Sequence, residues 1–301
     1  MTSSGNNHQG LVGIGDNVVD HYLDQAVYYP GGNALNVAVL AHRFGLTNSA
    51  YVGILGDDEE GKHVHSSIVA EGLSDSQLRF AKGATGKATV TLVNGDRVFV
   101  DSNRGGVRRK LMLRMDEDDL DRISSLGHVH SSCFSYLEPE LPRIRAHARG
   151  LSFDFSTGRD MAYLAAVCPT ITLAFLSASD LSDSETEALM AKVLSLGVPA
   201  ICVTQGERGA VFSDGRRTIR QGIVQARLVD TMGAGDAFIA GFLAAQIGGA
   251  SIADALPQAA SFAAKACGWP GAFGYPHPAR WSTVEPAVET TTAYRGRSGV
   301  P

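Results

Sequence analysis

Short apolar runs alternate with helical patterns along almost the whole chain. Runs that are typical of buried strands lie at residues 11–15, 49–55, 128–132, 151–155 and 200–204. Apolar residues at helical spacing predict helices at residues 33–44, 58–71 and 184–196, and from Ala234 and Ile252 onward. This alternation is typical of an α/β protein with a largely parallel sheet.

Two segments depart from the alternation. Residues 88–93 and 97–101 flank the tripeptide Asn94-Gly95-Asp96, and Asn-Gly between alternating runs is the strongest short signal for a β-hairpin. The stretch 18–29 also has an extended pattern. Because an antiparallel hairpin is unusual inside a parallel sheet, we expect a small β lid from about residues 17–30 and 87–105. The alternative is an antiparallel edge of the main sheet.

The 301 residues are 44% hydrophobic, which excludes a disordered chain. No repeat or linker divides the sequence, so we expect a polar tail over residues 1–10, one domain over 11–275 and an irregular, proline-containing tail over 276–301. The first ten residues lack the basic and apolar regions of a signal peptide. Residues 237–253 are too short and too interrupted by polar and glycine residues to span a bilayer.

Charge and cysteine content restrict the class of protein further. There are 26 Lys and Arg against 31 Asp and Glu, a formal net charge of −5, so no basic excess points to nucleic acid. Four cysteines stand far apart with no Cys-x-x-Cys pair, which argues against a disulfide framework or a zinc site: Cys133, Cys168, Cys202 and Cys267. We expect a cytoplasmic protein with no nucleic-acid or membrane partner.

The most informative motif is VDTMGAGDAFIAG at residues 229–241. It places small residues at the start of a predicted helix, where free N–H groups and the positive helix end form an anion site. Asp236 follows in the first turn, where it is placed to accept a proton from a hydroxyl held beside a phosphoryl group. An acid that only complements the helix dipole is the alternative. The two glycines and Asp230 favour the functional interpretation.

A second motif, at residues 29–45, opens a helix with Gly31 and Gly32. Its first turns present Asn33 and Asn36, which are three residues apart and therefore share one face. Side-chain amides there suit hydrogen bonds to a hydroxylated ligand. Asn33 has a structural alternative as a helix N-cap, whereas Asn36 lies inside the helix.

At these two motifs the sequence resembles the PfkB/ribokinase family of carbohydrate kinases. GGNALNVA resembles the N-terminal signature of that family and DTMGAGD its C-terminal signature, and the resemblance covers about residues 11–273. It implies a ribokinase-like three-layer α/β/α sandwich with a mostly parallel central sheet and a small β lid over the sugar site. It also implies transfer of the γ-phosphoryl group of ATP, with Mg²⁺, to a sugar hydroxyl.

The resemblance implies roles for individual residues. Asp236 matches the catalytic base, and the anion hole is matched by Gly233, Ala234 and Gly235. Candidate contacts to the sugar are Asp16, Asp20, Gly31, Gly32, Asn33 and Asn36. Thr204, Gly206 and Gly209 match the turn that binds nucleotide phosphates. Asp230 matches a monovalent-cation site found in many members, which makes K⁺ a candidate cofactor, and the lid of this family can also pair two subunits into a homodimer.

Two departures from the family pattern matter. Ser177-Ala178-Ser179-Asp180 stands where most members have an Asn-x-x-Glu motif that organises Mg²⁺ and phosphates, so Ser177 and Asp180 are the candidates for that role with a shorter acidic arm. Asp154-Phe155-Ser156 stands where many have Asp-Pro-Asn. Together with GDNVVD and FDFS, these substitutions resemble the branch that phosphorylates Amadori products, the fructoselysine 6-kinases.

A sugar-amine substrate would carry an amino-acid tail near the lid. Asp101 or Glu138 is a candidate partner for an ammonium group, and Arg104 for a carboxylate, although such charges more often belong to solvated loops. Two other functions stay open: an ordinary hexose, ketose or nucleoside kinase of the same family, and a catalytically weak protein that binds sugar or nucleotide.

Three other motifs carry less weight. Residues 81–88 resemble a Walker A loop, but a strand pattern follows them instead of a helix. Gly13 and Gly15 match only part of a dinucleotide fingerprint, because Val18 stands at the third glycine position. The pairs His63/His65 and His128/His130 lack a convergent third ligand for a metal.

Overall fold

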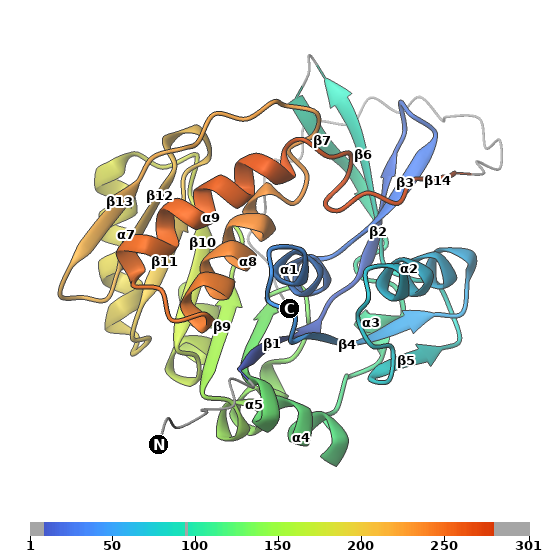
Figure 1. The fold of residues 1–301 in the computed structure, drawn as a ribbon, viewed down its shortest axis with the longest axis horizontal. Coiled ribbons are helices and arrows are strands. Elements are labelled where there is room, and N and C mark those ends of the chain that lie inside the picture. Colours follow the sequence, from blue (N-terminus) through green and yellow to red (C-terminus); the bar gives the residue numbers. More distant parts are fainter. Residues whose placement is uncertain (1–8, 94–95, 280–301) are drawn as a thin grey trace, which may run out of the picture.

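The computed structural model describes residues 9–93 and 96–279. Its main feature is a nine-stranded sheet (Figure 1). The spatial order of the strands is β13 (Thr218–Gln221), β12 (Ala210–Ser213), β11 (Ile201–Thr204), β10 (Leu173–Ser177), β9 (Gly150–Asp154), β8 (Gly127–Ser132), β1 (Gly10–Gly15), β4 (Ser49–Gly56) and β5 (Leu78–Ala81). Neighbours from β11 to β5 are parallel, whereas β12 and β13 pair antiparallel.

Helices cover both faces of this sheet. One apolar core lies under α1 (Asn33–Arg43), α2 (Glu59–Ala70), α8 (Ala234–Ile247) and α9 (Ile252–Ala266). The other lies under α4 (Glu117–Leu126), α5 (Leu141–His147), α6 (Met161–Val167) and α7 (Asp183–Ser195), with the short α3 (Val107–Lys110) at its edge. In β1, Leu11 joins the first core and Val12 the second, as alternation along a strand requires. The predicted three-layer α/β/α sandwich is confirmed.

Helix α1 packs closely on the central strand β1. A Cβ atom at Gly13 would collide with the backbone carbonyl of Ala34 in α1, so a residue without a side chain is needed at this crossing. All residues of α1 from Asn33 to Ala41 are buried. The close packing brings the N-terminus of α1 to the end of β1, where the candidate site lies.

The predicted lid is a separate five-stranded sheet, and its order is β14 (His277–Pro278), β3 (Val27–Gly31), β2 (Val18–Tyr22), β6 (Lys87–Val93) and β7 (Asp96–Ser102). The antiparallel edge of the main sheet exists, but β12 and β13 form it. The turn residues Asn94 and Gly95 lie outside the described residues. Within the predicted C-terminal tail, residues 277–278 pair with β3, and residues 280–301 lie outside the described part, as do residues 1–8.

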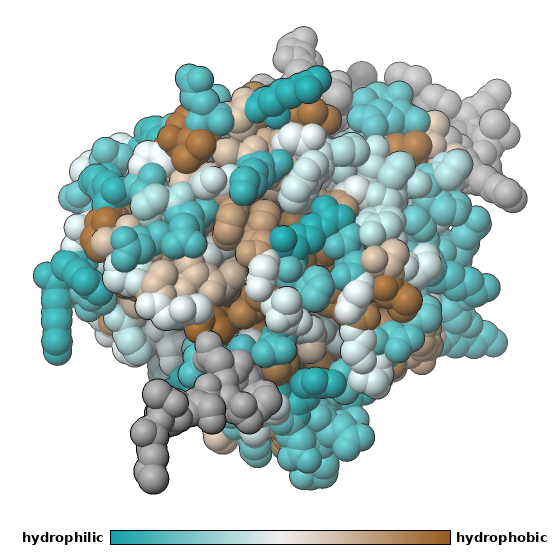
Figure 2. Space-filling model, in the orientation of Figure 1, coloured by the Kyte–Doolittle hydropathy of each residue, from teal (hydrophilic) through white to brown (hydrophobic). Residues whose placement is uncertain are grey.

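The surface in view carries mainly hydrophilic side chains, with apolar ones in small separate patches (Figure 2). Within the described ranges, none of the helices is both long enough and apolar enough to cross a membrane.

Candidate active site

The candidate residues gather where the parallel strands end. Asp16 follows β1, Ser132 ends β8, Asp154 ends β9, Ser177 ends β10 and Thr204 ends β11. Carboxyl ends of parallel strands form one edge of a sheet, and ligands of open α/β sheets bind there. The N-termini of α1 and α8 reach the same edge, as the contacts below show.

Asp236 is held by the two asparagines of the N-terminal motif. Asn33 Nδ2 donates to Asp236 Oδ1 at 2.8 Å, and Asn36 Nδ2 donates to Asp236 Oδ2 at 2.6 Å. The expected site residues Asn33, Asn36 and Asp236 are thus brought together across about 200 residues of sequence. Both amides donate to the carboxylate, so its rotation is restricted and its oxygens have a fixed orientation.

The surroundings of Asp236 tune its acidity. Burial of the carboxyl group raises its pKa to about 6, and the hydrogen bonds from Asn36 and Asn33 act in the opposite direction. Part of the residue nevertheless stays exposed to solvent. A carboxylate with a pKa near 6 is ionised at neutral pH and is a stronger base than an ordinary aspartate, which suits a general base.

A polar network below Asp236 was not predicted. Asn33 Nδ2 also donates to Asp154 Oδ2 at 2.9 Å, and Asn33 Oδ1 lies 3.0 Å from His130 Nε2. The other ring nitrogen of His130 bonds to Ser152 Oγ at 2.9 Å. The pKa of Asp154 is raised to about 7, mainly by burial and to a smaller extent by the nearby Asp236 and Asp16 charges. Because its two ring nitrogens bond to Ser152 and Asn33, His130 orients the Asn33 side chain.

Asp16 accepts hydrogen bonds from the N-terminus of α1. Its Oδ2 accepts the backbone N–H of Asn33 at 2.6 Å, and its Oδ1 accepts the hydroxyls of Ser132 and Ser135 at 2.8 and 2.9 Å. Asn33 is the first helical residue, and Gly32 is the N-cap without a side-chain bond. The side chain of Asp16 thus caps the N-terminus of α1, a role for which the sequence analysis offered Asn33 as a candidate. A direct contact of Asp16 with sugar stays a prediction.

The glycines beside α1 make room for other groups. A Cβ atom at Gly31 would collide with the carboxylate of Asp20 on lid strand β2, and one at Gly32 would lie 2.6 Å from the Asn17 Cα atom. Gly32 also has a φ of 107°, which favours glycine. Asp20 is only 5% exposed, and its contact with sugar stays a prediction.

The predicted anion loop has the geometry of a helix N-terminus. Gly233 is the N-cap of α8 in the left-handed conformation, with a φ of 72°, and Ala234 and Gly235 begin the helix. No atom lies within 4 Å of the position that a Cβ atom would take at Gly235, so a ligand has room to approach its backbone. First-turn N–H groups of a helix lack intrahelical acceptors and bind anions.

Asp230 stands just before this loop. Its Oδ1 accepts the N–H of Met232, and its Oδ2 accepts the N–H of Gly271, both at 2.9 Å. Its Oδ2 also accepts the hydroxyl of Tyr22, from the lid, at 2.7 Å. These contacts fix the loop, and K⁺ at Asp230 stays a prediction.

The nucleotide candidates lie on neighbouring strand ends. Ser177 Oγ and Thr204 Oγ1 are 3.2 Å apart, and Gly206, with a φ of 61°, packs beside Ser179. Gly209 has a φ of 85° and touches the backbone of residue 221. The predicted turn therefore lies beside the ends of β10 and β11, and its part in binding nucleotide stays a prediction.

Asp180 makes an ion pair that the sequence did not suggest. Arg159, from the loop after β9, binds both carboxylate oxygens of Asp180 at 2.6 and 2.8 Å and donates to the Ser177 carbonyl at 3.0 Å. The hydrogen bonds from Arg159 lower the pKa of Asp180 to about 2. Arg159 thus holds the side chain of Asp180 close to the end of β10.

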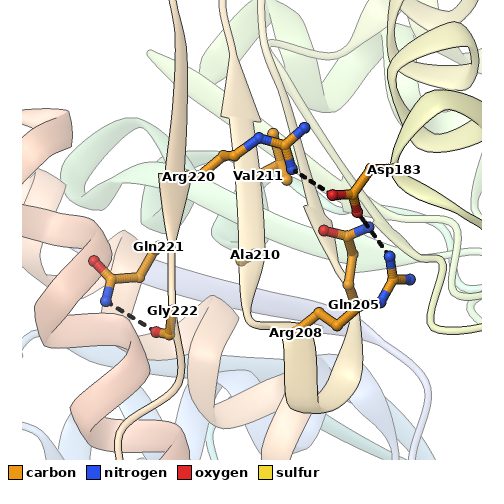
Figure 3. A pocket seen from close by; sticks show the side chains of 8 residues that line it. All are labelled: Asp183, Gln205, Arg208, Ala210, Val211, Arg220, Gln221 and Gly222. Atoms are coloured by element: carbon orange, nitrogen blue, oxygen red, sulfur yellow. Dashed lines mark hydrogen bonds and ion pairs between the residues drawn. The ribbon is translucent and has the colours of Figure 1, made fainter.

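A pocket of about 430 Å³ lies next to the turn at residues 204–209 (Figure 3). Arg208 and Arg220 converge there on Asp183, at 2.7 and 3.6 Å. Gln205 also donates to Asp183. Arg220 also pairs with Glu187 at 2.6 Å. Because two carboxylates of α7 compensate the two guanidinium groups, we assign this cluster to the packing of the turn against α7.

Asp101 and Arg104 lie where β7 leads back from the lid toward α3, at the opposite end of the strand from Asp96. Both are exposed. Asp101 Oδ1 accepts the N–H of Ser102, and Arg104 has a φ of 56° in the turn after β7. Their part in binding a substrate stays a prediction. Within residues 9–93 and 96–279, no group of three or more His, Cys, Asp or Glu side chains could hold a metal ion.

Comparison with known proteins identifies the family of this chain. The model of the pfkB family carbohydrate kinases matches residues 10–278. Fructosamine kinase FrlD of Bacillus subtilis is 48% identical over 271 residues, which cover 90% of this chain and 95% of the relative. Fructoselysine 6-kinase of Escherichia coli is 32% identical over 263 residues, which cover 87% of this chain and 99% of the relative.

Solved structures agree on the fold. Ribokinase of Arabidopsis thaliana, complexed with ribose and ATP, superimposes with a TM-score of 0.74 at 21% identity, covering 86% of this chain and 93% of that one. A putative ribokinase II of E. coli with ATP and Mg²⁺ gives 0.73 at 21% identity, covering 88% and 94%. The chain therefore belongs to the pfkB family of carbohydrate kinases, which makes it a phosphotransferase that acts on a sugar hydroxyl.

Proposed function

We propose that this kinase phosphorylates a fructosamine, an Amadori product such as fructoselysine, on its 6-hydroxyl, with ATP as donor. Both the 48% identical and the 32% identical relatives act, by their names, on this class of compound. Their matches span nearly the whole of both chains. The departures at residues 154–156 and 177–180 agree with the same branch.

The observation that carries the mechanism is the Asp236 carboxylate, fixed by two amides in the first turn of α8. In the proposed reaction, Asp236 accepts the proton of the sugar hydroxyl as its oxygen attacks the γ-phosphorus. The bond from γ-phosphorus to the β,γ-bridging oxygen breaks, and ADP leaves. Amides at residues 233–235 compensate the charge on the transferring group. Asp20 and Asn36 orient the sugar, and the lid excludes competing water.

The residues fit a nucleotide-bound Mg²⁺. This ion is usually held by one or two carboxylates together with phosphate oxygens, because it keeps several waters. Asp180 offers a side chain that is 60% exposed, tethered by Arg159 beside Ser177. Mg²⁺ supplies charge neutralisation of the phosphates when it is bound. In this proposal Asp180 holds the ion, and Thr204, Gly206 and Gly209 hold the nucleotide phosphates.

Further proposals rest on the family resemblance. K⁺ is proposed at Asp230, and a homodimer through the lid. On β7 of the lid, Phe99 and Val100 are 65% and 55% exposed, which supports the pairing of two lids. Arg104 is proposed to meet the carboxylate of the amino-acid tail, and Asp101 its ammonium group. The K⁺ proposal is tested by comparing the rate in K⁺ with the rate in Na⁺. The homodimer is tested by the molecular mass of the protein in solution.

A coupled assay of ADP release tests the proposed substrate. The acceptors are fructoselysine, a second Amadori compound, fructose, ribose and adenosine, each at the same concentration. We expect the highest kcat/KM with an Amadori compound and a phosphomonoester at carbon 6 of the product. A higher kcat/KM with fructose, ribose or adenosine would instead assign an ordinary ketose, pentose or nucleoside kinase. Binding of sugar without ADP release would assign a binding protein.

A further inference from the structure

The lid and the phosphate-binding loop meet in one packed junction. On lid strand β2, Asp20 and Tyr22 are two residues apart and therefore point to the same face. Asp20 belongs to the proposed sugar site. Tyr22 is 2% exposed, and its hydroxyl donates to Asp230 Oδ2 at 2.7 Å. One lid face thus carries both a residue of the proposed sugar site and the partner of Asp230, which precedes the anion loop.

Apolar contacts reinforce this junction. Tyr22, Tyr29 and Val90 form a small buried cluster of the lid, and Met232 of the anion loop packs against it. The rings of Tyr22 and Tyr29 meet edge to face, with centroids 5.1 Å apart. Tyr29 also covers Gly271, where a Cβ atom would lie 2.7 Å from its ring.

The contacts continue into the anion loop itself. Asp230 accepts the N–H groups of Met232 and Gly271, both at 2.9 Å. The next residue, Ala272, lies directly under Gly233, since a Cβ atom there would be 2.6 Å from the Ala272 Cβ atom. The Asp230 carboxylate therefore fixes residues on both sides of the loop that presents the anion-binding amides.

We propose that Tyr22 is a positioning residue that couples the lid to the anion hole: its hydrogen bond to Asp230 aligns the amides of residues 233–235 when the lid covers the sugar. The proposal rests on the proposed anion-hole function of that loop. A tyrosine hydroxyl suits this role because a hydrogen bond to a charged group contributes more than a neutral one. Tyr22 affects turnover through Asp230 and does not touch the reacting atoms.

The chain offers a matched control on the same lid. Tyr28, on β3, is 3% exposed, and its hydroxyl has no hydrogen-bond partner among the described residues. Its ring stacks on His21, on the opposite face of the lid from Tyr22. Tyr28→Phe therefore removes a buried lid hydroxyl without touching the junction.

The test is a double-mutant cycle of Tyr22→Phe and Asp230→Asn, with Tyr28→Phe beside it. We expect Tyr22→Phe to lower kcat about tenfold, equivalent to about 1.4 kcal/mol, with the KM values for sugar and ATP within about twofold of wild type. The double variant should be no slower than the slower single variant, because both substitutions break one linkage. The proposal would be overturned if the loss of kcat in the double variant equalled the product of the two single losses. It would also be overturned if Tyr28→Phe lowered kcat as much as Tyr22→Phe.

Hydrogen exchange of the backbone amides at residues 231–235 gives a readout that needs no turnover. Tyr22→Phe should speed their exchange several-fold, whereas Tyr28→Phe should leave it as in wild type. Unchanged exchange in Tyr22→Phe would overturn the coupling even if the wild-type protein phosphorylated none of the sugars tested. Lack of turnover in the wild type would count against the proposed function alone.

Discussion

Asn36 Nδ2 lies 2.6 Å from Asp236 Oδ2, although 200 residues separate the two positions in the sequence. This bond joins the first turns of α1 and α8 across the end of the sheet. The two sequence motifs are therefore parts of one site, in which the amides of the first hold the acid of the second. The acidity of Asp236 consequently depends on the residues of α1.

Substitution of Asn36 should change the pH dependence of the reaction. Burial raises the pKa of Asp236 to about 6, and the Asn36 bond holds it lower than it would otherwise be. In Asn36→Ala the ionised carboxylate loses a donor, so the pKa rises further. The acid limb of the pH profile of kcat/KM should move to higher pH.

Asn48→Ala is a suitable control, because Asn48 is an exposed asparagine beyond the opposite end of α1. Its profile should coincide with that of the wild type. An unchanged acid limb in Asn36→Ala would show that the bond does not govern the acidity of Asp236.

The space at Gly31 should control sugar affinity. A Cβ atom there would collide with the Asp20 carboxylate, so Gly31→Ala should displace this group from the sugar. We expect the KM for sugar to rise about tenfold or more, because a hydrogen bond to a charged group contributes roughly 1.5–3 kcal/mol. Calorimetry should show unchanged affinity for ATP. An unaltered KM for sugar would remove Asp20 from the site.

The buried Asp154 should make stability dependent on pH. Its pKa is about 7 in the folded protein, against about 3.9 in an unfolded chain. Between these values the folded state binds more protons, so the free energy of unfolding falls as pH rises, by up to about 1.4 kcal/mol per unit. Asp154→Asn removes this fall in the free energy of unfolding. The difference in stability between the variant and wild type should therefore shift in favour of the variant as the pH rises from 5 to 8.

Urea unfolding at several pH values measures this effect. Asp118→Asn, which replaces an exposed carboxylate of α4, should follow the wild-type curve. A constant difference between Asp154→Asn and wild type at all pH values would contradict the raised pKa.

Asp180 should govern the Mg²⁺ requirement. In Asp180→Asn the concentration of Mg²⁺ for half-maximal rate should rise about tenfold, as for other groups that orient a metal site. The melting temperature should hardly change, because an exposed ion pair contributes only about 0–1 kcal/mol. Arg159→Gln, which removes the partner and keeps the acid, should not raise the Mg²⁺ requirement. If it raises the requirement equally, the ion pair rather than Asp180 is responsible.

The sequence pattern predicted those elements whose apolar spacing is regular or whose ends are marked. Helix α7 begins at Asp183 after the capping box of Ser182 and Glu185, one residue before the predicted start. Helix α1 and strands β1, β4, β8 and β11 also appear within one or two residues of their predicted bounds. The motifs located Asp236, Asn33 and Asn36 because glycines followed by polar residues mark the start of a helix, which is a local feature of the sequence.

The parts that were not predicted depend on tertiary contacts. Helix α6 has seven residues, too few for a helical period to stand out, and β13 is partly exposed with no continuous apolar run. His130 belongs to the site only because β8 and β9 place it between Ser152 and Asn33. The Arg159–Asp180 pair spans two loops. One signal was available for Asp154: an acid at the end of a buried strand, beside the other strand ends.

The role of Asp236 as the general base is tested most directly by the turnover of Asp236→Asn together with its affinity for sugar and ATP. Asparagine keeps the size of the side chain but cannot accept the hydroxyl proton. We expect kcat to fall by about 10²- to 10⁴-fold, while dissociation constants from calorimetry stay within about threefold of wild type. Turnover close to that of the wild type, with binding intact, would contradict the assignment of Asp236 as the base.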